Sequence, residues 1–286
     1  MSLIASSIPT RSRRRGARLA PSMIAGLTLV GIVLVAAIVS FFWTPFDPTV
    51  TTPNRLLPPS PEHFLGTDTL GRDVFSQLLV GARTTLYVGV ISVGVAAIIG
   101  IPLGLLAAAA PKWLSESLMR LIDLMLAFPA LLLAIIFGAV FGSSTLSAMM
   151  AIGIATAPAF ARLTRSGAIQ VLSTDYVLAA RISRRSPLAI AGRHVLPNIL
   201  GLLIVQASVG YGIAVLAESG LSYLGFGTPP PTPSWGRMLQ EAQPIMFSAP
   251  LLSLWPAAAI VIAVLGFNLL GDGLRDRFDP KMEDRG

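Results

Sequence analysis

Five long stretches of the chain contain no Asp, Glu, Lys or Arg, and they constrain the fold more than any other feature. A helix needs about 20 apolar residues to cross a bilayer. The hydrocarbon interior offers no hydrogen-bond partner to an open backbone, so such stretches must be helical. The five stretches, of 22, 27, 38, 23 and 30 residues, are Ser22–Trp43, Thr84–Ala110, Leu124–Ala161, Val195–Ala217 and Ala242–Gly271.

The composition agrees with a polytopic membrane protein. Of the 286 residues, 53% are hydrophobic and 12% are charged, and the mean hydropathy is +0.73. A soluble domain carries about 25% charged residues, so a single soluble globule is excluded, as are disordered and collagen-like chains. The chain has no cysteine, which excludes disulfides, thiolate nucleophiles and cysteine-based metal sites.

The 38-residue stretch is too long for one span and is predicted to hold two helices, with a turn at 141–144. The first stretch exceeds the about 7–15 apolar residues of a signal peptide, so residues 21–43 are predicted to be a retained anchor. The predicted fold is therefore all-α, with six transmembrane helices. Pro102, Pro129 and Pro158 are each expected to be able to kink a helix.

The basic residues fix the predicted orientation. If the N-terminus is cytoplasmic, 17 Lys and Arg residues lie inside and 4 lie outside. The positive-inside rule then places both termini in the cytoplasm, including a basic tail at 1–20 and a second tail at 273–286. Because the basic residues are spread over separate inner segments, they do not indicate nucleic-acid binding.

Two outer loops are long enough to carry function. Residues 44–83 begin with proline-rich chain, after which Thr67 and Asp68 are expected to cap a short amphipathic helix. Residues 218–249 contain small residues and a proline run. This second loop is expected to be a lid, a docking ledge for an outside protein, or an inert cover.

The inner loop at 162–197 is predicted to form two short helices. Ser173 or Thr174 can cap the first helix, which has Asp175 in its first turn and arginines at its end. Ser186 can cap the second, with Pro187 at its first position, and Pro197 is expected to end it and open the next span. The small apolar face of these helices must pack on the bundle, on a partner protein, or on both.

The sequence indicates no energy source within the chain. It has only two lysines and no glycine-rich phosphate loop that would bind ATP. The charge-free stretches hold no acid, lysine or histidine for an ion relay. Residues His63 and His194 fall on opposite sides of the predicted membrane, which disfavours an enzyme or a metal site. A passive channel or an assembly scaffold is the alternative class, and an energy-supplying partner is needed for a driven transporter.

The inner loop resembles the ATPase-coupling loop of ABC importer permeases. Ala179, Ala180, Leu196 and Pro197 match the family pattern, and residues 193–198 are similar to its peptide and nickel branch. Leu178, Arg184 and His194 stand where Glu, Gly and Ile are usual. Glycine permits a left-handed turn between the two helices, so an arginine at 184 is expected to strain that turn unless it shifts by one residue.

Three further stretches resemble dipeptide and oligopeptide permeases of the C type, in the same order along the chain. They lie at 65–83, 218–236 and 268–280, so the resemblance covers residues 60–286. It implies a MetI-like fold with a five-helix permease core at 84–272, in the inner or plasma membrane of a prokaryote.

The resemblance also implies the partners. The chain would pair with a homologous B-type permease subunit, and separate or fused ATPase subunits would bind ATP and magnesium, so this chain would hold no cofactor. An extracytoplasmic binding protein would deliver dipeptides or oligopeptides, with nickel or haem as alternative substrates. The implied coupling-loop residues are Asp175, Tyr176, Leu178, Ala179, Ala180, Arg181, Arg184, Ser186, Pro187, Arg193, His194, Leu196 and Pro197. The implied docking or gate residues are Gly66, Asp68, Arg72, Asp73, Glu218, Tyr223 and Trp235.

Overall fold

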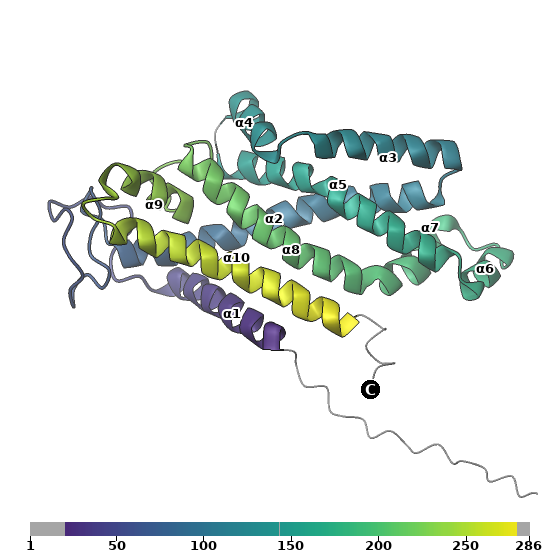
Figure 1. Ribbon diagram of the computed structural model, residues 1–286, viewed down its shortest axis with the longest axis horizontal. Coiled ribbons are helices and arrows are strands. Elements are labelled where there is room, and N and C mark those ends of the chain that lie inside the picture. Colours follow the sequence, from purple (N-terminus) through teal and green to yellow (C-terminus); the bar gives the residue numbers. More distant parts are fainter. Residues whose placement is uncertain (1–20, 143, 279–286) are drawn as a thin grey trace, which may run out of the picture.

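The computed structural model describes residues 21–142 and 144–278. The predicted tail at 1–20, Ser143, and residues 279–286 of the predicted tail at 273–286 lie outside this part. Every regular element in the described ranges is helical, and the long helices run side by side along one axis (Figure 1). These elements are α1 (Pro21–Phe42), α2 (Val74–Ala109), α3 (Lys112–Ala127), α4 (Ala130–Phe141), α5 (Thr145–Leu172), α6 (Asp175–Ile182), α7 (Pro187–Ile190), the π-helix η1 (Ala191–Val195), α8 (Leu196–Tyr223), α9 (Trp235–Ala242), the 3₁₀-helix η2 (Gln243–Ile245) and α10 (Leu251–Phe278).

The bundle has two distinct ends. One end, which we call the α9 end, carries the segment 43–73 together with α9 (Figure 1). The opposite end, which we call the α6 end, carries α6 and α7 (Figure 1). The long helices connect these two ends, so any communication between them must run along the helices.

Five helices of the described chain are long and apolar enough to cross a membrane. A sixth span exists if α3 and α4 count as one, and these two helices meet at an angle of 82°. The predicted all-helical fold is therefore confirmed, with five spans or the predicted six. The break falls at Pro129, because the residue before a proline is driven out of the helical region, and Phe128 is extended with φ −79° and ψ 126°. Pro102 and Pro158 lie inside α2 and α5.

The predicted separate helix after Asp68 is wrong. The structure instead starts α2 at Val74, and the helix continues without a break through residue 84 to Ala109. The carboxylate of Asp73 caps it by accepting a hydrogen bond from the backbone N–H of Ser76 at 2.8 Å. Gly81 and Arg83 lie within the helix, so the helix does not begin at residue 84, where the charge-free stretch starts.

Other helices also run past the edges of the charge-free stretches. Helix α5 extends to Leu172 and so contains Arg162 and Arg165, while α8 extends to Tyr223 and contains Glu218. A helix continues past the first charged residue wherever no breaker intervenes, so the first charge does not mark the helix end.

The most extensive contact between two helices in the bundle joins α2 and α5. Gly100 and Gly104 of α2 lie directly against the α5 backbone, where an added Cβ atom would come within 2.5 Å of the carbonyl oxygens of Ala157 and Ala161 respectively. Small residues spaced by four let two helix backbones approach closely inside a membrane. The pair therefore depends on these glycines for its separation.

We expect Gly100→Ala to destabilise the protein by about 1–3 kcal/mol, because the new methyl group forces α2 away from α5. Gly94→Ala is the matched control, since Gly94 lies in the same helix and a Cβ there meets nothing within 4 Å. The measurement is thermal unfolding of the purified protein in detergent, followed by circular dichroism. Equal midpoints for the two variants would contradict the close approach.

Candidate functional site

The α6 end carries the two predicted short helices. Helix α6 has Asp175 in its first turn and Arg181 in its last, which is the charge order that favours the helix dipole. Thr174 occupies the N-cap position, but its hydroxyl donates to the carbonyl oxygen of Val171 at 2.6 Å and does not cap α6. Ser186 does cap α7, as predicted, by accepting from the N–H of Ala189 at 3.2 Å, with Pro187 in the first turn.

The turn between α6 and α7 keeps the strained arginine expected from the sequence. Arg184 has φ +53°, in the left-handed region, so the turn has not shifted by a residue. The backbone N–H groups of Arg184 and Arg185 donate to the carbonyl oxygens of Arg181 and Ala180 at 2.9 and 3.3 Å. These bonds hold a conformation that costs a residue with a side chain about 1–2 kcal/mol.

The second short helix is not a separate element. Helix α7 continues through the π-helix η1 into α8, forming one 37-residue helix from Pro187 to Tyr223. The expectation that Pro197 ends the second short helix is therefore wrong. The wider π turn lies directly before Pro197 and accommodates a residue that has no N–H to donate within the continuous helix. The second short helix at the α6 end is thus continuous with a spanning helix.

The loop residues divide into a buried and an exposed set. Val177, Ala180, Ile190 and Val195 are buried and pack with residues of α5 and α8 such as Ile199. The exposed set holds large apolar and basic side chains, and the most exposed are Ile182 at 84% and Leu188 at 86%. We call the exposed set the α6 surface, and it consists of Tyr176, Leu178, Arg181, Ile182, Arg184, Arg185, Leu188 and Arg193.

The predicted coupling residues follow this division. Ala179, Ser186 and Pro187 are exposed beside the α6 surface, and Asp175 and Pro197 are also exposed. Ala180 faces the bundle, and His194 and Leu196 are half-buried in the continuous helix. The ring of His194 lies 6.0 Å from that of Tyr176, measured between centroids, so α6 and η1 touch across the turn.

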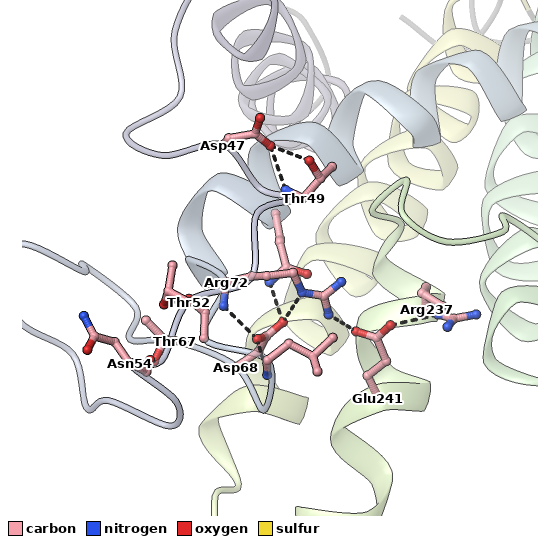
Figure 2. A network of polar contacts seen from close by, with 12 residues as sticks. Asp47, Thr49, Thr52, Asn54, Thr67, Asp68, Arg72, Arg237 and Glu241 are labelled. Atoms are coloured by element: carbon pink, nitrogen blue, oxygen red, sulfur yellow. Dashed lines mark hydrogen bonds and ion pairs between the residues drawn. The ribbon is translucent and has the colours of Figure 1, made fainter.

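At the α9 end, a polar network joins the segment before α2 to α9 (Figure 2). The buried guanidinium of Arg72 donates to Asp68 at 2.7 Å from Nε and pairs with Glu241 through another nitrogen. Glu241 also accepts from Nε of Arg237 at 2.9 Å, and Gln77 donates to Asp68 at 2.9 Å. Burial alone would lower the pKa of Arg72, but the two carboxylates raise it above its ordinary value, so the cation is fixed.

Two further contacts fasten α9 and the chain before it to α2. The indole N–H of Trp235 donates to the carbonyl oxygen of Leu78 at 3.0 Å. The hydroxyl of Thr84 donates to the carbonyl oxygen of Pro233, also at 3.0 Å. Trp235 is buried in the core cluster that includes Val74 and Tyr211. Helix α9 therefore lies against α2 by both packing and hydrogen bonds.

Glu218 provides the link between α9 and α8. It is 2% exposed and lies within α8, which corrects the expectation that it belongs to the loop after that helix. Its Oε1 accepts from the hydroxyls of Ser222 at 2.6 Å and Thr228 at 3.0 Å. Among the described residues, no basic side chain pairs with it, so hydroxyl groups are its partners. These bonds fold the chain after α8 back onto the helix.

The remaining docking or gate candidates are mostly internal. Asp73 is buried and accepts from Nδ1 of His63 at 2.9 Å as well as from Ser76. Gly66 is buried and adopts φ +80°, which suits glycine. Of the seven candidates, only Tyr223 is exposed. Most of the set therefore lies inside the α9 end, and its role in docking or gating stays a prediction.

Sequence reasoning missed several residues that form polar contacts at the α9 end. Glu241 and Arg237 stand four apart on α9, a spacing that signals a helical ion pair. His63 gave no local signal, because its partner Asp73 is reached only through the fold of the loop. Within the described ranges, no group of three or more His, Asp or Glu side chains could hold a metal ion.

Comparison with known proteins identifies the type of molecule. Residues 100–284 match the family described as binding-protein-dependent transport system inner membrane component. The dipeptide transport system permease protein DppC of Alkalihalophilus pseudofirmus is 42% identical over 261 residues, covering 91% of this chain and 86% of that protein. The glutathione transport system permease protein GsiD of Pectobacterium atrosepticum is 43% identical over 225 residues, covering 79% of this chain and 75% of that protein.

A solved structure supports the fold assignment. Inward facing conformations of the MetNI methionine ABC transporter match with a TM-score of 0.60 and 19% sequence identity, covering 71% of this chain and 96% of that chain. This likeness confirms the predicted MetI-like arrangement of helices, and the family match confirms the prediction of a transport component that is not itself an enzyme.

Breaking the polar network should loosen the α9 end. We expect Glu241→Gln to destabilise the protein by about 1–2 kcal/mol, because the buried Arg72 loses one of its two counter-charges. Glu116→Gln is the matched control, since the pair of Glu116 with Lys112 is exposed and 4.0 Å long, and its loss should cost under about 0.5 kcal/mol. Thermal unfolding in detergent measures both, and equal shifts would show that the network contributes nothing specific.

Proposed function

The chain belongs to the family of inner membrane components of binding-protein-dependent transport systems, and from this premise we propose that it forms one half of an ATP-driven peptide importer. In this proposal an extracytoplasmic binding protein delivers the peptide at the α9 end. A homologous B-type permease subunit forms the other half of the pathway. ATPase subunits, which bind ATP and magnesium, attach at the α6 end.

The observation that carries the proposal is the continuous helix from Pro187 to Tyr223. Its first turns lie beside the exposed α6 surface, and its far end carries Glu218. A partner that moved α6 and α7 would therefore move α8 directly, because the backbone is helical without a break from α7 to α8. This is the geometry that a permease needs if the energy comes from a separate protein.

The distribution of charge supports the orientation. Of the 14 Lys and Arg residues in the described ranges, 10 lie toward the α6 end and 4 toward the α9 end. The positive-inside rule then makes the α6 end cytoplasmic. An ATPase that consumes cytoplasmic ATP can reach the α6 surface only from that side.

The proposed mechanism uses the differential affinity of ATP for two states of the ATPase pair. When the ATPases close around ATP, they displace the α6 surface, and α8 moves with it. At the other end, Glu218 holds the chain that leads to α9, and α9 is fastened to α2 through Trp235 and Arg72. Because these contacts join α2, α8 and α9, the three helices would move together at the end that faces the binding protein.

The relatives support peptides as the substrate class. Their names refer to dipeptides, di/tripeptides and glutathione, which all present peptide-like amides. We therefore favour a small peptide over nickel or haem. A passive channel or scaffold would not require the α6 surface, which exposes both apolar and basic side chains and is connected to a spanning helix.

Placing a charge on the α6 surface should uncouple the transporter. In the complex reconstituted with its partner permease, ATPases and binding protein, we expect Leu188→Asp to lower peptide-stimulated ATP hydrolysis and uptake at least about tenfold, since an aspartate would be desolvated in the interface. Leu188→Met, which keeps an apolar side chain of similar size at the same position, is the control and should have little effect. Full transport by Leu188→Asp would rule out ATPase docking there.

Relieving the strain at Arg184 should stabilise the α6–α7 turn. We expect Arg184→Gly to raise the free energy of unfolding by up to about 1 kcal/mol, because glycine adopts positive φ without cost. Arg185→Gly serves as the control, since Arg185 is not among the residues with positive φ. Thermal unfolding and coupled ATP hydrolysis are measured together. Loss of stability in Arg184→Gly would contradict the strain, and loss of coupling alone would assign Arg184 a direct contact with the ATPase.

A further inference from the structure

An open pocket at the α9 end has no part in the proposed function. Its volume is about 480 Å³, and it lies between the end of α1, the segment 44–49, α2 and residues 232–233. Two charged residues line it, Arg83 from α2 and Asp47 from the segment after α1. Three residues with hydroxyl groups also line the pocket: Thr44, Thr49 and Thr232.

The surroundings place the pocket at the level of lipid headgroups. Helix α1 ends at Phe42, and exposed aromatic side chains cluster at this point, including Phe41, Phe42 and Trp43. Aromatic residues gather where the hydrocarbon of a bilayer meets its polar surface. Ser40, two residues before the end of α1, also lines the pocket. The pocket therefore opens at the boundary between hydrocarbon and water.

The guanidinium of Arg83 is held in place but keeps donors free. Its Nε donates to the hydroxyl of Ser40 at 3.2 Å, and a second nitrogen donates to the Ser40 carbonyl oxygen. The group also lies 4.1 Å from the centre of the Phe41 ring. No carboxylate of the described residues pairs with it. A fixed guanidinium with spare N–H groups matches the oxygens of a phosphate.

The carboxylate of Asp47 supplies the opposite charge. Its Oδ1 accepts from the N–H and the hydroxyl of Thr49 at 2.8 and 2.6 Å, and no described residue donates to Oδ2. The hydrogen bond from the Thr49 hydroxyl, with help from the backbone, lowers the pKa of Asp47, so the group is ionised at neutral pH. An anion alone would leave the carboxylate of Asp47 without a partner, whereas a ligand that carries both a phosphate and an ammonium can pair with Arg83 and with Asp47.

We propose that this pocket binds the headgroup of phosphatidylethanolamine, with the phosphate at Arg83 and the primary ammonium at Asp47. A primary ammonium donates hydrogen bonds to a carboxylate, which the trimethylammonium of phosphatidylcholine cannot do. A membrane lipid fits better than a soluble zwitterion, because the pocket opens among exposed aromatic residues at headgroup level. The bound lipid would join α1 to α2 and to the chain that enters α9.

The test measures lipid adducts on the purified full-length chain by native mass spectrometry, in mixed micelles with phosphatidylethanolamine or phosphatidylcholine of the same acyl chains. We expect the unaltered chain to bind phosphatidylethanolamine more tightly. Asp47→Asn keeps an oxygen for Thr49 but removes the charge, so the preference between the lipids should fall about tenfold. Arg83→Gln should weaken both lipids by a similar factor. Glu62→Gln and Arg55→Gln, on exposed residues of the same outer segment, should change neither.

The outcomes separate the proposal from its alternatives. Equal binding of the two lipids by the unaltered chain, or an unchanged preference in Asp47→Asn, would overturn it. Displacement of the lipid by soluble phosphoethanolamine or a dipeptide at low concentration would assign the pocket to a soluble zwitterion and also overturn it. If Arg83→Gln fails to fold by circular dichroism, Asp47→Asn still decides, because Asp47 is exposed and its turn is preserved.

Discussion

The structure depends on one constraint, which is that hydrocarbon offers the backbone no hydrogen-bond partner. The constraint makes every span a helix and requires each departure from the helix to be compensated locally. At Pro129 the chain turns by 82° between two helices, and α4 packs its small residues Ala134 and Gly138 inward. Where a polar side chain enters the bundle, as Glu218 does, hydroxyl groups of the adjacent chain satisfy it.

The same constraint explains why α7 merges with α8. A proline at 197 would ordinarily break a helix in mid-course, but here a π turn directly before it accommodates the missing N–H and the helix continues. The result is one continuous helix, Pro187–Tyr223, that begins at the α6 end and ends at the opposite end of the bundle.

Hydropathy was enough to predict the spans, because apolar stretches of more than 20 residues have few alternatives in a membrane. Local chemistry predicted the cap at Ser186, and the resemblance to the family, which usually has Gly at position 184, led to the expectation of a left-handed residue there. The extent of α2 and the helical position of Glu218 were missed, because charge was used to mark where helices end. The pairing of Arg72 with Glu241 joins residues 169 positions apart, and only the fold brings them together.

The two ends of the bundle differ in how firmly they are held, and this difference suits the proposed division of labour. At the α9 end, Arg72, Trp235 and Glu218 connect three helices through buried polar contacts, so relative motion there would expose unsatisfied groups. At the α6 end, α6 is held by a small apolar contact through Val177 and Ala180, and its outer face is free. Motion is therefore easiest at the α6 end, where a partner would apply force. The strained Arg184, in the turn between α6 and α7, reduces the stability of the resting conformation. It therefore lowers the free energy needed to change that conformation.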